Sequence, residues 1–257
     1  MRSRTGAANR IPLVLLMAAL LAPQPLNAGE IRVAVASNFR QVMAELATLF
    51  EAATGHEVTV IPGSSGKHYA QIVHGAPFDA FFSADAERPL RLERERRIQP
   101  GSRFTYAIGK LVLWSPREDF VDPEGKVLTM GSFGHLAIAN PQLAPYGAAA
   151  REVLQSLGIW ERLTGKLVRG ENIGQTFQFV VSGNADLGFV SRAQLKMPGR
   201  PFGGSAWDPP QSLYSRIDQQ AVLLDDSAAG RAFMAFVQSE ESRALIRTYG
   251  YDVPDVQ

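Results

Sequence analysis

The stretch IRVAVASNFRQVMAELATLFEAATGHEVTVIPGSSGKHY, residues 31–69, decides the fold. Its first seven residues alternate with a period of two, which predicts a strand. Apolar side chains then recur at helical spacing from Phe39 to Phe50, and Gly55 marks a natural helix end. A second strand is expected over residues 57–63, and a short helix after it. A strand–helix–strand unit of this kind predicts an α/β fold with largely parallel sheets.

The same alternation continues to the end of the chain, with turn-rich and loop segments in between. Further strands are predicted over residues 78–84, 110–115, 135–141, 186–191 and 220–224. Helices are predicted over residues 147–158, 172–183 and, as one long final helix, 228–249. A segment rich in proline and glycine, residues 197–210, predicts a loop.

The segment GSSGKHY, residues 63–69, has the composition of a phosphate-binding loop. A nucleotide P-loop needs four residues between its glycines, followed by lysine and then serine or threonine. Here two residues separate Gly63 from Gly66, and His68 follows Lys67. The spacing therefore excludes a P-loop, and it also departs from the G-x-S-x-G turn of serine hydrolases.

Four predicted strand-to-helix junctions share small or polar residues at the helix start. They are Ser37-Asn38, Ser64-Ser65-Gly66, Pro145-Tyr146-Gly147 and Asn172-Ile173-Gly174. In open α/β sheets ligands bind beyond the carboxyl ends of the strands, where helix N-termini offer unpaired N–H groups to anions. Taken singly, each junction also fits an N-cap or a plain turn. The four together predict converging donors for a small anion.

The N-terminal segment and the composition indicate an exported protein. Three arginines in residues 1–10 precede an apolar run over residues 11–22, and Ala28 is a plausible cleavage point, which predicts a signal peptide over residues 1–28 and a periplasmic location. The chain has no cysteine, which excludes disulfides and a thiol nucleophile. Without the leader, 23 basic side chains face 25 acidic ones, a net charge of −2 that does not suit nucleic-acid binding.

Several segments together resemble one known family. They are VAVASNF, VIPGSSGKHYAQIVHGAPFDAFFSAD, SRFTYAIGKLVLWSP, LAIANPQLAPYG and LGFV. The resemblance is to the periplasmic molybdate-binding proteins of ABC importers and runs through about residues 30–253. It implies a two-lobed type II periplasmic-binding fold with the ligand in the interlobe cleft. Lobe I is then expected over residues 29–108 plus 216–257, and lobe II over residues 109–215.

The resemblance also implies which residues hold the ligand. A tetrahedral oxyanion between the lobes would contact Ser37, Asn38, Ser65, Tyr146 and Ile173. Tyr146 and Ile173 would donate main-chain N–H groups. Some members carry a tyrosine directly after the LGxV strand, where this chain has Ser191, so Asn38 is expected to complete the shell instead. No cofactor and no bare metal cation are expected, because molybdenum would enter as molybdate.

The expected function is capture of molybdate, and of tungstate, by a monomer that delivers the ion to a membrane permease without any chemistry on it. The nearest alternative is the same scaffold binding sulfate or another oxyanion. A phosphate site would want an acceptor carboxylate, and Glu171 is the nearest acid to the four junctions. An exported serine hydrolase that uses Ser65 and His68 is the alternative from a different class.

Overall fold

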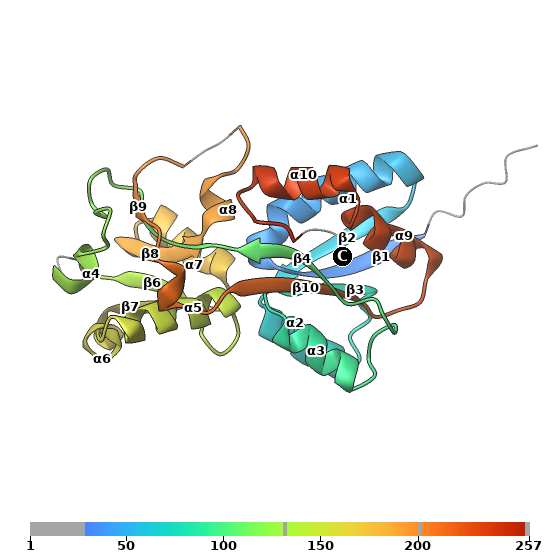
Figure 1. Cartoon of the computed structure of the whole chain (residues 1–257), viewed down its shortest axis with the longest axis horizontal. Coiled ribbons are helices and arrows are strands. Elements are labelled where there is room, and N and C mark those ends of the chain that lie inside the picture. Colours follow the sequence, from blue (N-terminus) through green and yellow to red (C-terminus); the bar gives the residue numbers. More distant parts are fainter. Residues whose placement is uncertain (1–28, 131–132, 200–201, 255–257) are drawn as a thin grey trace, which may run out of the picture.

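The computed structural model describes residues 29–130, 133–199 and 202–254, and the predicted signal peptide lies outside them. Two five-stranded sheets lie side by side, each covered by helices (Figure 1). This confirms the predicted two-lobed α/β architecture. In the described part of the chain, no helix is long and apolar enough to cross a membrane.

The first sheet has the strand order β2-β1-β3-β10-β4. Its strands are β1 (Glu30–Ala36), β2 (Glu57–Gly63), β3 (Ala80–Phe82), β4 (Phe104–Gly109) and β10 (Ile217–Leu223). Its helices are α1 (Arg40–Thr54), α2 (Ser65–Val73), α3 (Glu87–Arg94), α9 (Ala228–Val237) and α10 (Glu240–Thr248), with the 3₁₀ turn η1 (Ser37–Phe39) between β1 and α1. Helices α1, α9 and α10 cover one face of this sheet, and α2 and α3 cover the other (Figure 1).

The second sheet has the strand order β7-β6-β8-β5-β9. Its strands are β5 (Leu111–Ser115), β6 (Leu136–Ala139), β7 (Leu167–Gly170), β8 (Leu187–Ser191) and β9 (Ser205–Trp207). Around it lie α4 (Val127–Met130), α5 (Pro145–Ser156), α6 (Trp160–Leu163), α7 (Ile173–Val181), α8 (Arg192–Leu195), η2 (Thr164–Lys166) and η3 (Gln211–Leu213).

Each sheet contains one strand that runs against its neighbours. Strand β10 pairs antiparallel with β3 and β4, and β5 pairs antiparallel with β8 and β9. These two strands lie where the chain passes between the sheets. The chain enters the second sheet at β5, which follows β4 after the single residue Lys110, and it returns to the first sheet at β10. The remaining pairs, such as β1 with β2, are parallel as predicted, so the carboxyl ends of those strands share one edge.

The predicted long final helix is wrong, because it is two helices. Helix α9 ends at Val237, and α10 begins at Glu240. Ser239 separates them as an N-cap whose side chain accepts a hydrogen bond from the N–H of Ser242. The predicted loop over residues 197–210 also contains the short strand β9, and β4 and β7 were not predicted at all.

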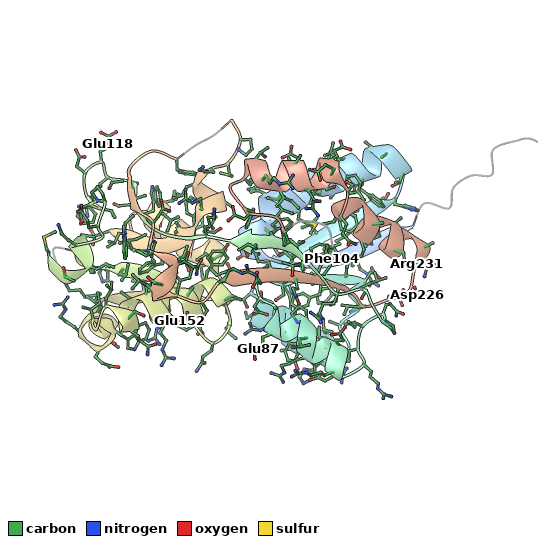
Figure 2. The ribbon with its side chains drawn as sticks, in the orientation of Figure 1. Glu87, Phe104, Glu118, Glu152, Asp226 and Arg231 are labelled. Atoms are coloured by element: carbon green, nitrogen blue, oxygen red, sulfur yellow. The ribbon has the colours of Figure 1, made fainter. Side chains whose placement is uncertain are left out.

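Buried apolar side chains form the core of both lobes. In the first lobe, aromatic contacts join the turn after β1 to β4 and to the C-terminal segment. The ring of Phe39 lies edge-on to Tyr106 and Tyr251, with centroids 4.7 and 5.4 Å apart. Exposed charged side chains lie at the outer ends of the molecule, such as Glu118 in one lobe and Arg231 in the other (Figure 2). The Tyr251 contact places this part of the C-terminal segment against the turn that follows β1.

Asp186 gives the second lobe a pH-dependent contribution to stability. Its carboxylate accepts the N–H groups of His135 (3.0 Å) and Gly134 (2.8 Å) and pairs with Arg117, and these contacts hold its pKa below the usual range. A lowered folded pKa stabilises the fold above the unfolded pKa of about 3.9, and this contribution is lost as the pH falls through the folded value. We expect Asp186→Asn to lower Tm at pH 7 by roughly 2–4 °C, and by much less at pH 2.5.

Thermal unfolding followed by circular dichroism at both pH values measures this difference. The exposed Glu118→Gln is the matched control for removal of one negative charge, and it should change Tm little at either pH. An equal loss for Asp186→Asn at pH 7 and pH 2.5 would contradict the assignment.

Candidate functional site

A small cavity lies between the two lobes, where helices from both sheets begin. The volume open to the centre of a water-sized sphere is about 10 Å³. All five predicted ligand residues line this cavity: Ser37, Asn38, Ser65, Tyr146 and Ile173. Among the described residues around it, none has a charged side chain. Such a cavity suits one compact solute held by hydrogen bonds.

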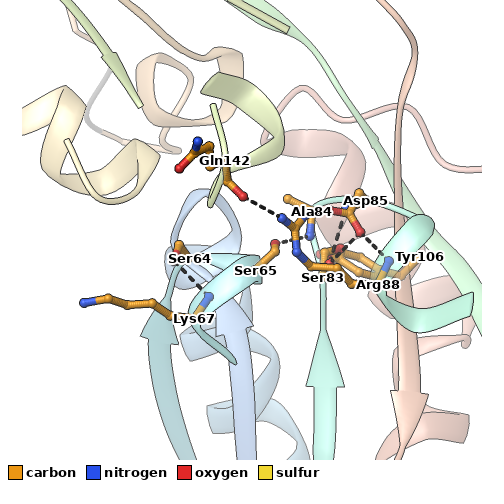
Figure 3. A network of polar contacts seen from close by, with 9 residues as sticks. All are labelled: Ser64, Ser65, Lys67, Ser83, Ala84, Asp85, Arg88, Tyr106 and Gln142. Atoms are coloured by element: carbon orange, nitrogen blue, oxygen red, sulfur yellow. Dashed lines mark hydrogen bonds and ion pairs between the residues drawn. The ribbon is translucent and has the colours of Figure 1, made fainter. Parts of the chain in front are cut away.

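The two serines present hydroxyl groups whose oxygens are already engaged. The hydroxyl oxygen of Ser65 accepts the N–H of Ala84 at 2.9 Å (Figure 3). The hydroxyl oxygen of Ser37 accepts the N–H of Gly174 at 3.1 Å. Each hydroxyl keeps its proton, because an oxygen that accepts from a main-chain N–H can still donate. Both serines can therefore act as donors toward the cavity.

The second lobe contributes the N-termini of α5 and α7. Tyr146 follows Pro145 in the first turn of α5, which has no side-chain cap. Ile173 is the first residue of α7, and the N-cap Asn172 accepts the N–H of Gln175 at 2.9 Å rather than that of Ile173. First-turn N–H groups have no carbonyl partner within the helix, and the helix dipole makes this end attractive to anions. Tyr146 and Ile173, at which main-chain donors are predicted, both border the same cavity.

Asn38 and Tyr146 also send their side chains into a buried polar network behind the cavity. The Asn38 amide nitrogen donates to Gln219 Oε1 at 2.7 Å and to the Tyr251 hydroxyl at 2.9 Å. The Ser191 hydroxyl donates to the Tyr146 hydroxyl at 3.1 Å. Ser191, which stands where some family members have a tyrosine, therefore supports Tyr146 instead of lining the cavity.

Burial keeps the network tyrosines protonated. Desolvation raises the pKa of Tyr106, Tyr146 and Tyr251 above the ordinary value. Each hydroxyl therefore has one proton to donate near neutral pH. The Tyr251 hydroxyl donates to the main-chain oxygen of Asn38 at 3.0 Å, which anchors the turn that carries Ser37 and Asn38.

Contacts between the lobes surround the cavity and hold it closed. The N–H of Gly66 donates to the Leu143 oxygen at 2.8 Å, and the Arg88 guanidinium donates to the Gln142 oxygen at 3.1 Å (Figure 3). The Lys67 ammonium pairs with both carboxylate oxygens of Glu171, at 2.7 and 2.8 Å. Glu171 does not line the small cavity, so its carboxylate is not an acceptor inside it.

His68 does not form a catalytic pair with Ser65. Its ring is buried, edge-on to Phe78 and Phe81, with Nδ1 3.2 Å from Gln71 Oε1, and burial lowers its pKa. The Ser65 hydroxyl is engaged by Ala84 instead. Within the described residues, no group of three or more histidine, aspartate or glutamate side chains could hold a metal ion.

Sequence reasoning missed the residues behind the site. Gln219 and Tyr251 contact Asn38 from positions 181 and 213 residues away, and Tyr106 reaches Gln219 across 113 residues. No local motif marks such contacts. Gln219 stands between Asp218 and Gln220 in the polar first half of β10, so its complete burial could not be read from the sequence.

A two-lobed α/β fold with a donor-lined cavity between its lobes defines the class of solute-binding proteins. The family model described as "Bacterial extracellular solute-binding protein" matches residues 31–252. The chain belongs to this family and, by its curated relatives, to the ModA proteins within it. It is a binding protein and not an enzyme, so the serine hydrolase hypothesis is wrong.

Two relatives and one solved structure are especially similar. The molybdate-binding protein ModA of Rhodobacter capsulatus is 49% identical over 88% of this chain and 90% of its own length. ModA of Azotobacter vinelandii is 46% identical over 93% of this chain and 96% of its own length. The solved periplasmic molybdate-binding protein of Azotobacter vinelandii superposes with a TM-score of 0.85 and 44% identity, over 88% of this chain and 100% of that chain.

The approach of α5 to β6 requires glycine at position 147. A Cβ there would lie 2.2 Å from the main-chain oxygen of Ala139. We expect Gly147→Ala to push the start of α5 off the sheet and to destabilise the protein by about 1–3 kcal/mol. Urea unfolding measures the change, and Gly165→Ala is the control, because a Cβ there meets nothing within 4 Å. Equal stability of the two variants would refute the close approach.

Proposed function

We propose that this chain is a periplasmic receptor that captures molybdate, and also tungstate, between its lobes and delivers the ion to an ABC import permease. The observation that carries the proposal is the small cavity bordered by helix N-termini and two serine hydroxyls, without a charged side chain. A doubly negative oxyanion only accepts hydrogen bonds, so a site built from donors suits it. The molybdate-binding relatives at 46% and 49% identity support the same ligand.

The proposed ligand shell consists of the hydroxyls of Ser37 and Ser65, the main-chain N–H groups of Tyr146 and Ile173, and Asn38. Each hydrogen bond to a charged acceptor contributes roughly 1.5–3 kcal/mol before desolvation is counted. About five such bonds, offset by desolvation and closure, leave affinity in the micromolar to nanomolar range, or about −8 to −12 kcal/mol. The rigid main-chain donors set the cavity size, and therefore disfavour the smaller sulfate.

The proposal extends to the organisation of the chain. Lobe I comprises residues 29–108 plus 216–257, and lobe II comprises residues 109–215. Residues 1–28 act as the signal peptide, and the protein works as a monomer that meets the membrane permease in its closed form. The interlobe contacts of Lys67 and Arg88 support this closed form, because they join residues of different lobes around the cavity.

Titration calorimetry with molybdate, tungstate, sulfate and phosphate tests the ligand. We expect molybdate and tungstate to bind most tightly, because their similar radii match one cavity and their fully deprotonated forms need only donors. Tighter binding of sulfate than of molybdate would contradict the proposal and favour the alternative oxyanion.

Ser65→Ala tests the placement of the oxyanion. Loss of one charge-assisted bond should weaken molybdate binding by about 1.5–3 kcal/mol, and the Tm of the ligand-free protein should fall by roughly 2–6 °C, because the buried N–H of Ala84 loses its acceptor. Lys67→Ala is the control, because it removes an exposed ion pair and should weaken binding by at most about 1 kcal/mol. An unchanged affinity for Ser65→Ala, or an equal loss for Lys67→Ala, would place the ligand elsewhere.

A further inference from the structure

The Asn38 side chain leaves one buried polar atom without a partner. Asn38 is only 5% exposed, its amide nitrogen makes two hydrogen bonds, and its Oδ1 makes none with the described residues. A buried acceptor without a partner is unfavourable and rare in folded proteins. Since Gln219 and Tyr251 hold the nitrogen end, Oδ1 is the end of the amide left for the cavity that Asn38 lines.

An oxygen in that place conflicts with an oxyanion. An amide oxygen only accepts hydrogen bonds, and so does a fully deprotonated oxyanion, so the two would repel. The proposed ligand shell needs a donor here. The contacts of Gln219 show how the chain can provide one.

Gln219 makes three contacts, and two of them involve its oxygen. Its Oε1 lies 2.7 Å from the Asn38 nitrogen and 3.1 Å from the Tyr106 hydroxyl, and its Nε2 lies 3.4 Å from the Tyr146 hydroxyl. The Tyr106 hydroxyl also lies 3.0 Å from the Ser83 main-chain oxygen. The single hydroxyl proton of Tyr106 therefore faces two acceptors, Gln219 Oε1 and the Ser83 oxygen. Gln219 Nε2 has two protons but only the Tyr146 hydroxyl as a partner among the described residues.

A rotation of both amides by 180° gives Asn38 Oδ1 a donor and removes the competition for the Tyr106 proton. An amide keeps nearly the same shape when its oxygen and nitrogen exchange places. Gln219 Nε2 then donates to both Asn38 Oδ1 and the Tyr106 hydroxyl, and the Tyr106 proton is free for Ser83. The Tyr146 hydroxyl donates to Gln219 Oε1 while still accepting from Ser191.

The two rotations must occur together. If only one amide rotated, two nitrogens or two oxygens would face each other at the 2.7 Å contact between Asn38 and Gln219. In the rotated arrangement Asn38 Oδ1 takes the place of the nitrogen 2.9 Å from the Tyr251 hydroxyl, so the single Tyr251 proton is shared between Oδ1 and the Asn38 main-chain oxygen at 3.0 Å. Among the residues of this network, the group then left without a protein partner is the Asn38 Nδ2, which is a donor.

We infer that Gln219 is a positioning residue that holds the Asn38 amide with its nitrogen toward the bound oxyanion. This inference rests on the proposed function and deepens it. Gln219 acts through Asn38 and does not touch the ligand, because Asn38 lines the cavity and Gln219 does not. The same rotation makes Asn38 a donor, so the site offers no acceptor there to a protonated oxyanion.

A double-mutant cycle with Gln219→Glu and Asn38→Ala tests the inference by titration calorimetry with sodium molybdate. A carboxylate at position 219 only accepts, so it holds the Asn38 nitrogen and turns the oxygen toward the cavity. We expect Gln219→Glu alone to weaken binding by about 10- to 100-fold. In the Asn38→Ala background the same change should weaken binding by less than about threefold. An equal loss in both backgrounds would overturn the inference, because a general effect of the charge does not need Asn38.

Gln220→Glu is the matched control. It adds the same charge one residue along β10, where the side chain contacts Arg103 and Thr105 instead of Asn38. We expect its affinity for molybdate to stay within about twofold of the wild type. A loss as large as that of Gln219→Glu would also overturn the inference.

The wild-type protein gives a second measurement that does not depend on the folding of Gln219→Glu. In ¹⁵N NMR spectra, the side-chain amide signals of Asn38, assigned by their loss in Asn38→Ala, should shift on saturation with molybdate. Unmoved Asn38 signals at saturation would contradict the inference while leaving molybdate binding established. If the wild type bound sulfate instead, the proposed ligand would fail, and the cycle run with sulfate would still measure the role of Gln219.

Discussion

The proposed function depends on one constraint: an anion would be held between the two lobes by a cavity that no charged side chain among the described residues lines. Helix N-termini meet this constraint, because their first N–H groups lack partners within the helix and carry partial positive charge. Parallel strands put these N-termini at one edge of each sheet, as β1 and β2 do before Ser37 and Ser65. The cavity forms where the edges of the two sheets face each other.

The buried polar network behind the cavity connects the two lobes. Tyr146 comes from the second lobe, and its hydroxyl lies among Ser191 and Gln219, which is on the return strand β10. Strand β4, from which the chain leaves the first sheet, ends beside this network at Gly109. A Cβ on Gly109 would lie 2.2 Å from the Tyr146 hydroxyl and 2.8 Å from Gln219 Nε2. The glycine at position 109 therefore lets β4 end close to the buried Tyr146 and Gln219 side chains.

Two residues that attracted notice in the sequence have roles outside the ligand shell. Lys67 lies outside the cavity and joins the lobes through Glu171, as an exposed pair that contributes modestly to stability. His68 is buried in the first lobe against Phe78 and Phe81, close to Gly63. Both follow from helix geometry, because α2 turns successive side chains toward solvent, the other lobe or the core.

By itself, the sequence determined the alternation of strands and helices and the polar junctions around Ser37, Ser65 and Ile173. These are local features, because periodicity and capping act over a few residues. The break of the final helix at Ser239 is also local, because the Ser239 cap acts on Ser242, three residues on. Only the tertiary structure decided that one strand in each sheet is reversed and that Gln219 contacts Asn38. These depend on contacts between residues far apart in the chain, which no local pattern records.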